Sequence, residues 1–377
     1  MSNAHYMCMC FAQDEEAGSP NNPRGLHGGE HVMREGFRAG GGAIREVVAY
    51  KLDRGFAEVP PTAVDKLLLR SMSGTHLNEQ KGSIQQFVES VGDAGAFRFD
   101  GSDFDETTCQ RMALQDVRLF NCDRHEGNVL VRPPSEPSEA ASTGAEDAPE
   151  RVPGGHGPDS LWGIEARHAA VEWRRKRGHE VVPIDHAFCL PSFGYFREAE
   201  LVWQYWVAAK QPFSDDAVAY AAAIDVDVDV AIARRVGLSA SACATLRVTT
   251  MLIQRMMRAP LAGGEVCTPL TLARMILRTE FDVPSPLERM CARALGIGED
   301  ELHKDTALIS HVRAAARLQQ EGEEPEEAGG ARLEGEGVAV LEPEFVPPPE
   351  FFARFAAQLD EELGAASTSQ GDDARSQ

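Results

Sequence analysis

The chain has 377 residues, of which 43% are hydrophobic, and its formal net charge is −22 at pH 7. This length and apolar content suffice for one large domain or for two lobes. The negative charge argues against a nucleic-acid partner, which would need a basic surface, and against electrostatic docking on anionic membranes unless basic residues cluster locally.

The negative charge is concentrated in the last part of the chain, and the cysteines lack the spacing of a metal or redox site. Residues 321–377 hold 15 acidic and 3 basic residues, so they carry 3 − 15 = −12 of the net charge. The eight cysteines form no C-x-x-C pair, which disfavours a zinc or redox motif. No run of about 18 apolar residues and no apolar leader is present. We therefore expect a reducing compartment: the cytoplasm, with peripheral membrane attachment and the nucleus left open.

The first hundred residues predict a small mixed region. A short strand is expected over residues 7–11, a helix over 43–53, a turn over 56–62 and a strand over 63–72. Residues 83–88 form another short apolar segment. The helix prediction rests on apolar side chains at helical spacing, which are Ile44, Val47, Val48 and Leu52.

The middle of the chain combines a clear helix with an insertion. A helix is predicted over 106–120, followed by a loop and a strand over 128–131. Residues 133–180 have the Pro-, Ser- and Glu-rich composition of a disordered insertion, although 164–176 could form a helix. A buried strand is then predicted over 181–190.

The rest of the chain predicts helices. They are expected over 199–209, 215–225, 228–236, 240–258, 269–279 and 286–295, with an extension over 313–320. Trp203 and Trp206 are interpreted as core residues rather than as a ligand platform. The acidic tail is predicted to be largely disordered, except for an amphipathic helix over 349–363.

Two acidic segments carry the candidate chemistry. Asp123 and Asn128 lie in a loop between a helix and a strand, and Asp185 follows the apolar strand segment. In phosphoryl transfer, a loop aspartate orients the nucleophile, while an asparagine five residues later and a second aspartate hold the metal. Carboxylate and amide oxygens suit Mg²⁺ or Mn²⁺ rather than zinc.

The order of these motifs resembles the phosphatidylinositol 3-/4-kinase superfamily, and within it the type II phosphatidylinositol 4-kinases of the plant gamma group. The resemblance covers about residues 11–295 without the insertion. The stretches that carry it are NNPRG (21–25), REVVAY (45–50), VPPT (59–62), KGSIQQFV (81–88), DVRLFNCDRHEGN (116–128), PIDH (183–186), WQYW (203–206), QPF (211–213) and LRVTTML (246–252).

The resemblance implies an α+β, two-lobed, protein-kinase-like fold with a truncated N-lobe and a mainly helical C-lobe. Residues 1–90 would form the partial N-lobe and the hinge. Residues 91–320 would form the C-lobe, interrupted by the low-complexity insertion at 133–180, and residues 321–377 the acidic, largely disordered tail.

The resemblance also implies cofactors and residue roles. ATP with Mg²⁺ (or Mn²⁺) would bind between the lobes, and Glu46 would pair with a nucleotide-contacting lysine. Structural roles for the histidines of the two motifs also stay open. The residues implied are Asp123, Arg124 and His125 for catalysis, Asn128 and Asp185 for the metal, and Gln86, Phe87 and Val88 for the hinge that meets adenine.

Three functions stay open at this point. Family members phosphorylate the 4-position of phosphatidylinositol, which makes this lipid the first expected acceptor and implies peripheral membrane contact. Some plant-type relatives act on protein Ser/Thr instead, which is the second. The third is a catalytically weakened pseudokinase that acts as an interaction module through its acidic tail.

Two residues depart from the family pattern. Ala12 falls where the nucleotide-binding lysine is expected, which indicates either a sequence that begins downstream of the complete N-lobe or a weakened kinase. Ala187 stands where glycine commonly follows the Asp-His pair, and it would be strained if that position required a positive φ. The insertion is expected to be neutral.

Overall fold

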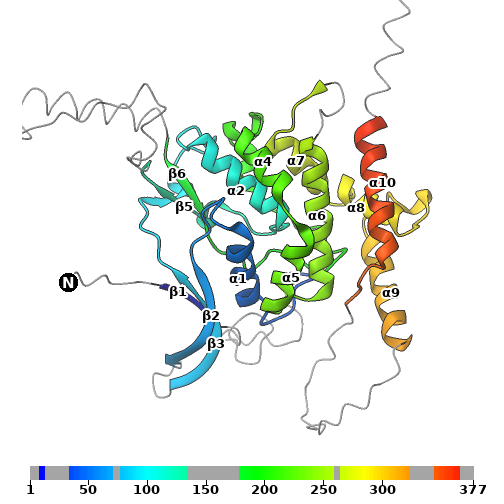
Figure 1. Cartoon of the computed structure of the whole chain (residues 1–377), viewed down its shortest axis with the longest axis horizontal. Helices are drawn as coiled ribbons and strands as arrows, with labels where there is room; N and C mark the ends of the chain where they lie inside the picture. Colours follow the sequence, from blue (N-terminus) through cyan, green and yellow to red (C-terminus); the bar gives the residue numbers. More distant parts are fainter. Residues whose placement is uncertain are drawn as a thin grey trace, which may run out of the picture.

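The structure is a computed structural model that describes residues 8–12, 34–70, 77–134, 178–258, 264–322 and 344–365. Two antiparallel sheets lie on one side of the molecule, most helices lie on the other, and helix α1 (Gly42–Asp53) lies between them (Figure 1). This arrangement confirms the predicted two-part α+β fold. The helix expected over 164–176 falls outside the described residues.

The first sheet and α1 form the small lobe. The strands are β1 (Cys8–Ala12), β2 (Thr62–Arg70) and β3 (Leu77–Gln86), paired antiparallel in the order β1-β3-β2. Helix α1 packs against β2 and β3, and its residues Val48 and Leu52 are fully buried. The predictions of a strand near 7–11, a helix over 43–53 and a strand near 63–72 are confirmed.

The second sheet supports the candidate site. It consists of β4 (Gly92–Asp93), β5 (Val129–Arg132) and β6 (Glu180–Pro183) in the order β4-β5-β6. Val129 pairs with Pro183, so the start of β5 and the end of β6 lie side by side. The strand predicted over 181–190 was too long, because β6 ends before Asp185 and the chain turns into a loop.

Helices make up most of the large lobe. Thr268 and Ser285 cap α7 and α8 through reciprocal side-chain and backbone hydrogen bonds, and proline follows each cap. The helix predicted over 106–120 and the helices predicted after residue 210 are confirmed, most of them with small shifts at their ends. They are α2 (Glu106–Arg118), α4 (Asp215–Ala223), α5 (Val226–Val236), α6 (Ala240–Arg258), α7 (Pro269–Ile276), α8 (Pro286–Ala294), α9 (Ala307–Gly322) and α10 (Pro349–Ala365).

The helix predicted over 199–209 is wrong. The chain forms two short 3₁₀ turns there, Val202–Tyr205 and Val207–Lys210. Trp203 lies in the first turn, and Trp206 is the extended residue between the two turns. Both side chains face the core, 1% and 2% exposed, which confirms their interpretation as core residues.

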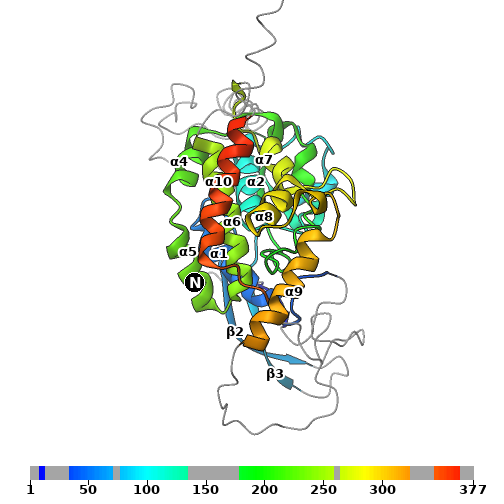
Figure 2. The same ribbon diagram turned by 90° about the vertical axis from the view of Figure 1, so that its right-hand side faces the viewer.

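The amphipathic helix expected in the tail is confirmed as α10, which packs against α6 and α8 (Figure 2). Phe351 and Phe355 are fully buried in the main core. The predicted C-lobe ended at residue 320, which placed residues 349–365 outside it. In the structure these residues pack against the C-lobe. Within the described ranges, no helix combines the length and apolar content needed to cross a bilayer.

A second, smaller core joins the two lobes. Val48 and Leu52 of α1 pack with Leu246 of α6 and with Leu119 and Leu190, which belong to the two loops of the candidate site. The position of α1 is therefore tied by apolar contacts to the segments that carry Asp123 and Asp185.

Candidate functional site

Two loops meet at the junction of the lobes. One runs from the end of α2 to β5 and carries Asp123, and the other follows β6 and carries Asp185. Backbone hydrogen bonds join them, from Leu190 N to Leu119 O (2.7 Å) and from Cys122 N to Phe188 O (2.9 Å). This pairing brings together the two acidic segments that the sequence singled out.

Arg124 is fully buried beneath these loops. Its guanidinium donates to both carboxylate oxygens of Asp116, at 3.0 and 3.1 Å, and to the carbonyl oxygens of Asn128 and Ile184. It also donates to His186 Nε2 at 3.0 Å. Because its donors are used inside the protein, we assign Arg124 a positioning role in place of the predicted catalytic one.

Asp116 is the centre of this buried network. Besides Arg124, its carboxylate accepts hydrogen bonds from Asn121 Nδ2 (3.0 Å) and from Trp203 Nε1 (2.9 Å). The side-chain oxygen of Asn121 in turn accepts from the backbone N–H of Asp123, at 2.8 Å. The conformation of the Asp123 loop therefore depends on a carboxylate that lies inside α2.

Asp123 itself is partly exposed, and its carboxylate forms an ion pair of 2.5 Å with Arg34. Burial raises the pKa of Asp123 above its usual value, while the positive charge of Arg34 acts in the opposite direction. This placement suits a carboxylate that must contact a substrate.

Asn128 ends the same loop and begins the turn into β5. Its side-chain Nδ2 donates to the carbonyl oxygen of Asp123 at 2.8 Å, so its amide oxygen remains the end suited to a metal. The backbone carbonyl oxygen of Asn128 accepts a hydrogen bond from Ile184 N at 3.1 Å. This bond fixes the distance between the loop and the segment before Asp185.

Asp185 has a left-handed backbone conformation, with φ of 53°. Such a conformation costs a residue other than glycine about 1–2 kcal/mol and often marks a functional site. Burial raises the pKa of Asp185, and the negative charge of Asp123 acts in the same direction, while a hydrogen bond from the backbone of Ala187 acts against it. Ala187 does not have a positive φ, so the backbone strain expected there is absent. The residue of this segment with the strained conformation is Asp185.

Glu46 projects from α1 into the same region. Its Oε1 accepts from His186 N at 2.6 Å, and Arg124 donates to the far side of the His186 ring. His186 Nδ1 therefore carries the proton and lies 3.9 Å from Glu46 Oε2, and both atoms are buried without a hydrogen-bond partner. Burial and the nearby Asp185 raise the pKa of Glu46. Glu46 thus contacts the loop of Asp185, and its pairing with a nucleotide-contacting lysine stays a prediction.

His125 stabilises the end of its loop. Its Nδ1 accepts from the backbone N–H of Gly127 at 3.1 Å and so caps the short 3₁₀ turn Glu126–Asn128. The structure therefore shows a structural contact for His125. Whether its other ring nitrogen assists catalysis stays a prediction.

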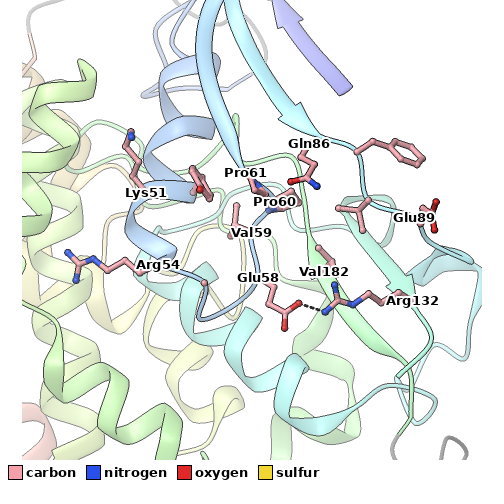
Figure 3. A pocket seen from close by; sticks show the side chains of 14 residues that line it. Lys51, Arg54, Glu58, Val59, Pro60, Pro61, Gln86, Glu89, Arg132 and Val182 are labelled. Atoms are coloured by element: carbon pink, nitrogen blue, oxygen red, sulfur yellow. Dashed lines mark hydrogen bonds and ion pairs between the residues drawn. The ribbon is translucent and has the colours of Figure 1, made fainter. Parts of the chain in front are cut away.

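The predicted hinge begins at Gln86, the last residue of β3. Gln86 N donates to Pro61 O at 2.8 Å, so this N–H already has an acceptor, and the predicted contacts with adenine are restricted to the backbone of Phe87 and Val88. All three hinge residues line a cavity of about 780 Å³, which also contains the ion pair between Glu58 and Arg132 (Figure 3). The acidic residues of the two loops do not line this cavity.

The fit of a metal ion follows from the donors present. Among the described residues, no group of three or more His, Cys, Asp or Glu side chains is arranged to hold a metal by itself. Mg²⁺ in kinases needs no such cage, because it uses one or two protein groups and completes its coordination with phosphate oxygens and water. The pair Asn128 and Asp185 fits this pattern.

Two residues that contact the candidate loops were not singled out from the sequence. The sequence offered one indication for Asp116, which is the first residue of the motif that continues to Asn128. The structure shows why it matters: its carboxylate is buried in a helix, and a buried carboxylate needs a charged partner. The sequence offered none for Arg34, because it lies 89 residues from Asp123 and its segment showed no periodicity.

Comparison with known proteins agrees with this geometry. Residues 30–264 match the family model described as phosphatidylinositol 3- and 4-kinase. This span includes α1, both candidate loops and helices α2, α4, α5 and α6, so it covers more than half of the chain and its entire candidate site.

Curated relatives point the same way. The chain is 31% identical over 301 residues to phosphatidylinositol 4-kinase gamma 4 of Oryza sativa subsp. japonica, covering 74% of this chain and 43% of that protein. It is 28% identical over 336 residues to phosphatidylinositol 4-kinase gamma 3 of Arabidopsis thaliana, covering 83% of this chain and 50% of that protein. The chain thus spans half or less of the length of these relatives. It belongs to the phosphatidylinositol 3- and 4-kinase family.

Proposed function

We propose that the chain transfers the γ-phosphate of ATP to phosphatidylinositol, at the 4-position of the inositol ring. The observation that carries this proposal is the meeting of Asp123, Asn128 and Asp185 at adjoining loop ends, because phosphoryl transfer needs a carboxylate at the acceptor beside a metal-holding pair. The names of the curated relatives support the choice of lipid and ring position.

Each residue has a distinct role in this proposal. Asp123 orients the acceptor hydroxyl and accepts its proton, and the side chains of Asn128 and Asp185 hold Mg²⁺ or Mn²⁺. When bound, the metal neutralises charge on the phosphate oxygens. Glu46 acts by hydrogen-bonding the backbone of His186, which holds the loop of Asp185 in place. The backbone of Phe87 and Val88 meets the adenine.

A lipid acceptor requires contact with a bilayer surface, and an exposed apolar patch near the Asp123 loop suits that role. Phe99 and Tyr205 are 68% and 56% exposed, and their rings stack at 5.6 Å between centroids. Tyr205 lies four residues after Leu201, which pairs with Arg124. Tyrosine, with an apolar ring and a polar hydroxyl, is favoured at membrane interfaces, and Phe99 adds exposed apolar surface beside it, so we include both residues in the proposed membrane contact.

The test offers two acceptors in parallel. Purified protein is incubated with γ-labelled ATP and Mg²⁺, together with phosphatidylinositol vesicles or with a generic protein substrate, and vesicle co-sedimentation is measured in the same samples. We expect label in the lipid and protein in the vesicle pellet. Label only in protein would make the chain a Ser/Thr protein kinase. No label in either acceptor would leave the pseudokinase function.

A further inference from the structure

Arg34 lies at the edge of the two candidate loops. Its Nη2 is 2.5 Å from Asp123 Oδ1 and 3.9 Å from a carboxylate oxygen of Glu200, and its Nη1 donates to the carbonyl oxygen of Cys122. These contacts place a guanidinium directly against the carboxylate that is proposed to face the acceptor.

The same guanidinium also contacts the second loop. It lies 5.0 Å from the centroid of the Phe188 ring, and Phe188 follows Asp185 by three residues. A cation over an aromatic face gains roughly 0.5–1 kcal/mol at partly exposed sites. Arg34 therefore touches both segments that form the site.

Arg34 differs from Arg124 in accessibility. Arg124 is fully buried and its contacts lie within the protein, whereas the Arg34 side chain is 22% exposed and pairs with a partly exposed carboxylate. Both side chains of this pair reach solvent, so a phosphoryl oxygen of a substrate can approach the Arg34 guanidinium. The planar fork of arginine matches phosphate oxygens as well as carboxylates.

The backbone beside Arg34 is fixed to the large lobe. Ser192 N donates to Gly36 O at 2.8 Å, Phe37 is buried in the main core, and Arg38 forms an ion pair of 3.1 Å with Glu344. Arg34 can therefore change partners by moving its side chain while its backbone stays in place.

The charge balance of the site makes such a cation useful. Asp123 and Asp185 carry carboxylates near the proposed position of an anionic substrate, and Ala12 stands where a lysine was expected. Among the charged side chains described around the loops, Arg124 is committed to Asp116. Arg34 is the partly exposed cation that contacts both loops.

We propose that Arg34 is a substrate-binding residue that leaves Asp123 and binds a phosphoryl oxygen when the substrates are present. This inference rests on the proposed function. Two groups present that chemistry, the phosphodiester of phosphatidylinositol and the γ-phosphate of ATP, and the release of Asp123 frees its carboxylate for the acceptor hydroxyl.

The test measures binding and turnover separately. Calorimetry gives the affinities of wild type, Arg34→Ala and Arg34→Lys for MgATP and for a soluble short-chain phosphatidylinositol, and steady-state kinetics give KM and kcat for both. Arg197→Ala is the matched control, because Arg197 is 21% exposed, pairs with Asp305 and lies over the ring of Phe281 as Arg34 lies over Phe188. We expect Arg34→Ala to weaken one ligand by about 10- to 100-fold. Arg34→Lys should be intermediate and the control unchanged.

The ligand that weakens identifies the phosphate source. Equal affinities of wild type and Arg34→Ala for both ligands would overturn the inference. Faster phosphate transfer by Arg34→Ala would also overturn it, because the ion pair would then only block access to the Asp123 carboxylate. Wild-type protein that neither binds nor turns over these ligands would instead refute the proposed function, and the inference with it. If Arg34→Ala lowers the melting temperature, the affinities of Arg34→Lys test the inference instead: weaker binding than wild type supports it, and equal binding overturns it.

Discussion

Replacement of Asp123 by asparagine is expected to lower phosphate transfer by about 10³-fold, because a positioned general base typically contributes 10²- to 10⁴-fold. Asparagine keeps the shape of the side chain but cannot accept the proton of the acceptor hydroxyl. The Asp123 side chain is partly exposed and its ion-pair partner is Arg34, so the fold should tolerate the change. Label transfer from ATP, measured beside the melting temperature, checks both expectations.

The matched control for this variant is Asp305→Asn. Asp305 forms an ion pair of 3.3 Å with Arg197, and both side chains are partly exposed as in the pair of Asp123 with Arg34. The control should transfer phosphate at the wild-type rate. If Asp123→Asn retained most of the activity, the transfer would take place elsewhere, or in a contaminant, and the assignment of Asp123 would be refuted.

Replacement of Asp116 by alanine is expected to destabilise the fold by about 3–5 kcal/mol, because it leaves the buried Arg124 without its carboxylate partner. Asn121 and Trp203 would lose their acceptor at the same time. Since Asn121 also holds the backbone N–H of Asp123, any folded fraction should be inactive. Chemical denaturation followed by circular dichroism measures the change in the free energy of unfolding.

An exposed ion pair provides the comparison for Asp116. Asp227 is 78% exposed and pairs with Arg247 at 2.6 Å, so Asp227→Ala should cost less than about 1 kcal/mol. A loss for Asp116→Ala no larger than that of Asp227→Ala would contradict the view that this buried network holds the Asp123 loop.

The sequence predicted the helices of the chain because their apolar residues recur at helical spacing. It was wrong where tertiary contacts override that spacing. Trp203 and Trp206 sit three residues apart, which is compatible with a helix, but a backbone pairing between Leu201 and Arg124 sets a tighter geometry. The end of β6 was also missed, because the apolar residues around Asp185 continue into a loop.

The candidate site was predictable where its residues belong to continuous motifs, as in the segments of Asp123 and Asp185. The sequence could not show that the role of Arg124 differs from the roles of Asp123 and His125. That difference follows from its complete burial, which directs its hydrogen bonds to the loop itself. Nor could the sequence place Arg34 beside Asp123, because this contact depends on how the segment after residue 33 packs against the large lobe. The left-handed conformation of Asp185 likewise appears only in three dimensions.

The most direct test of the account is calorimetric titration of ATP into wild type and Asp185→Asn, with and without Mg²⁺. Asparagine tolerates the left-handed conformation of residue 185, so the variant removes the charge and keeps the loop. We predict that wild type binds ATP only with Mg²⁺ and that the variant binds it at least about tenfold more weakly. Equal affinity in both proteins, or no binding by wild type, would contradict the metal–nucleotide site proposed here.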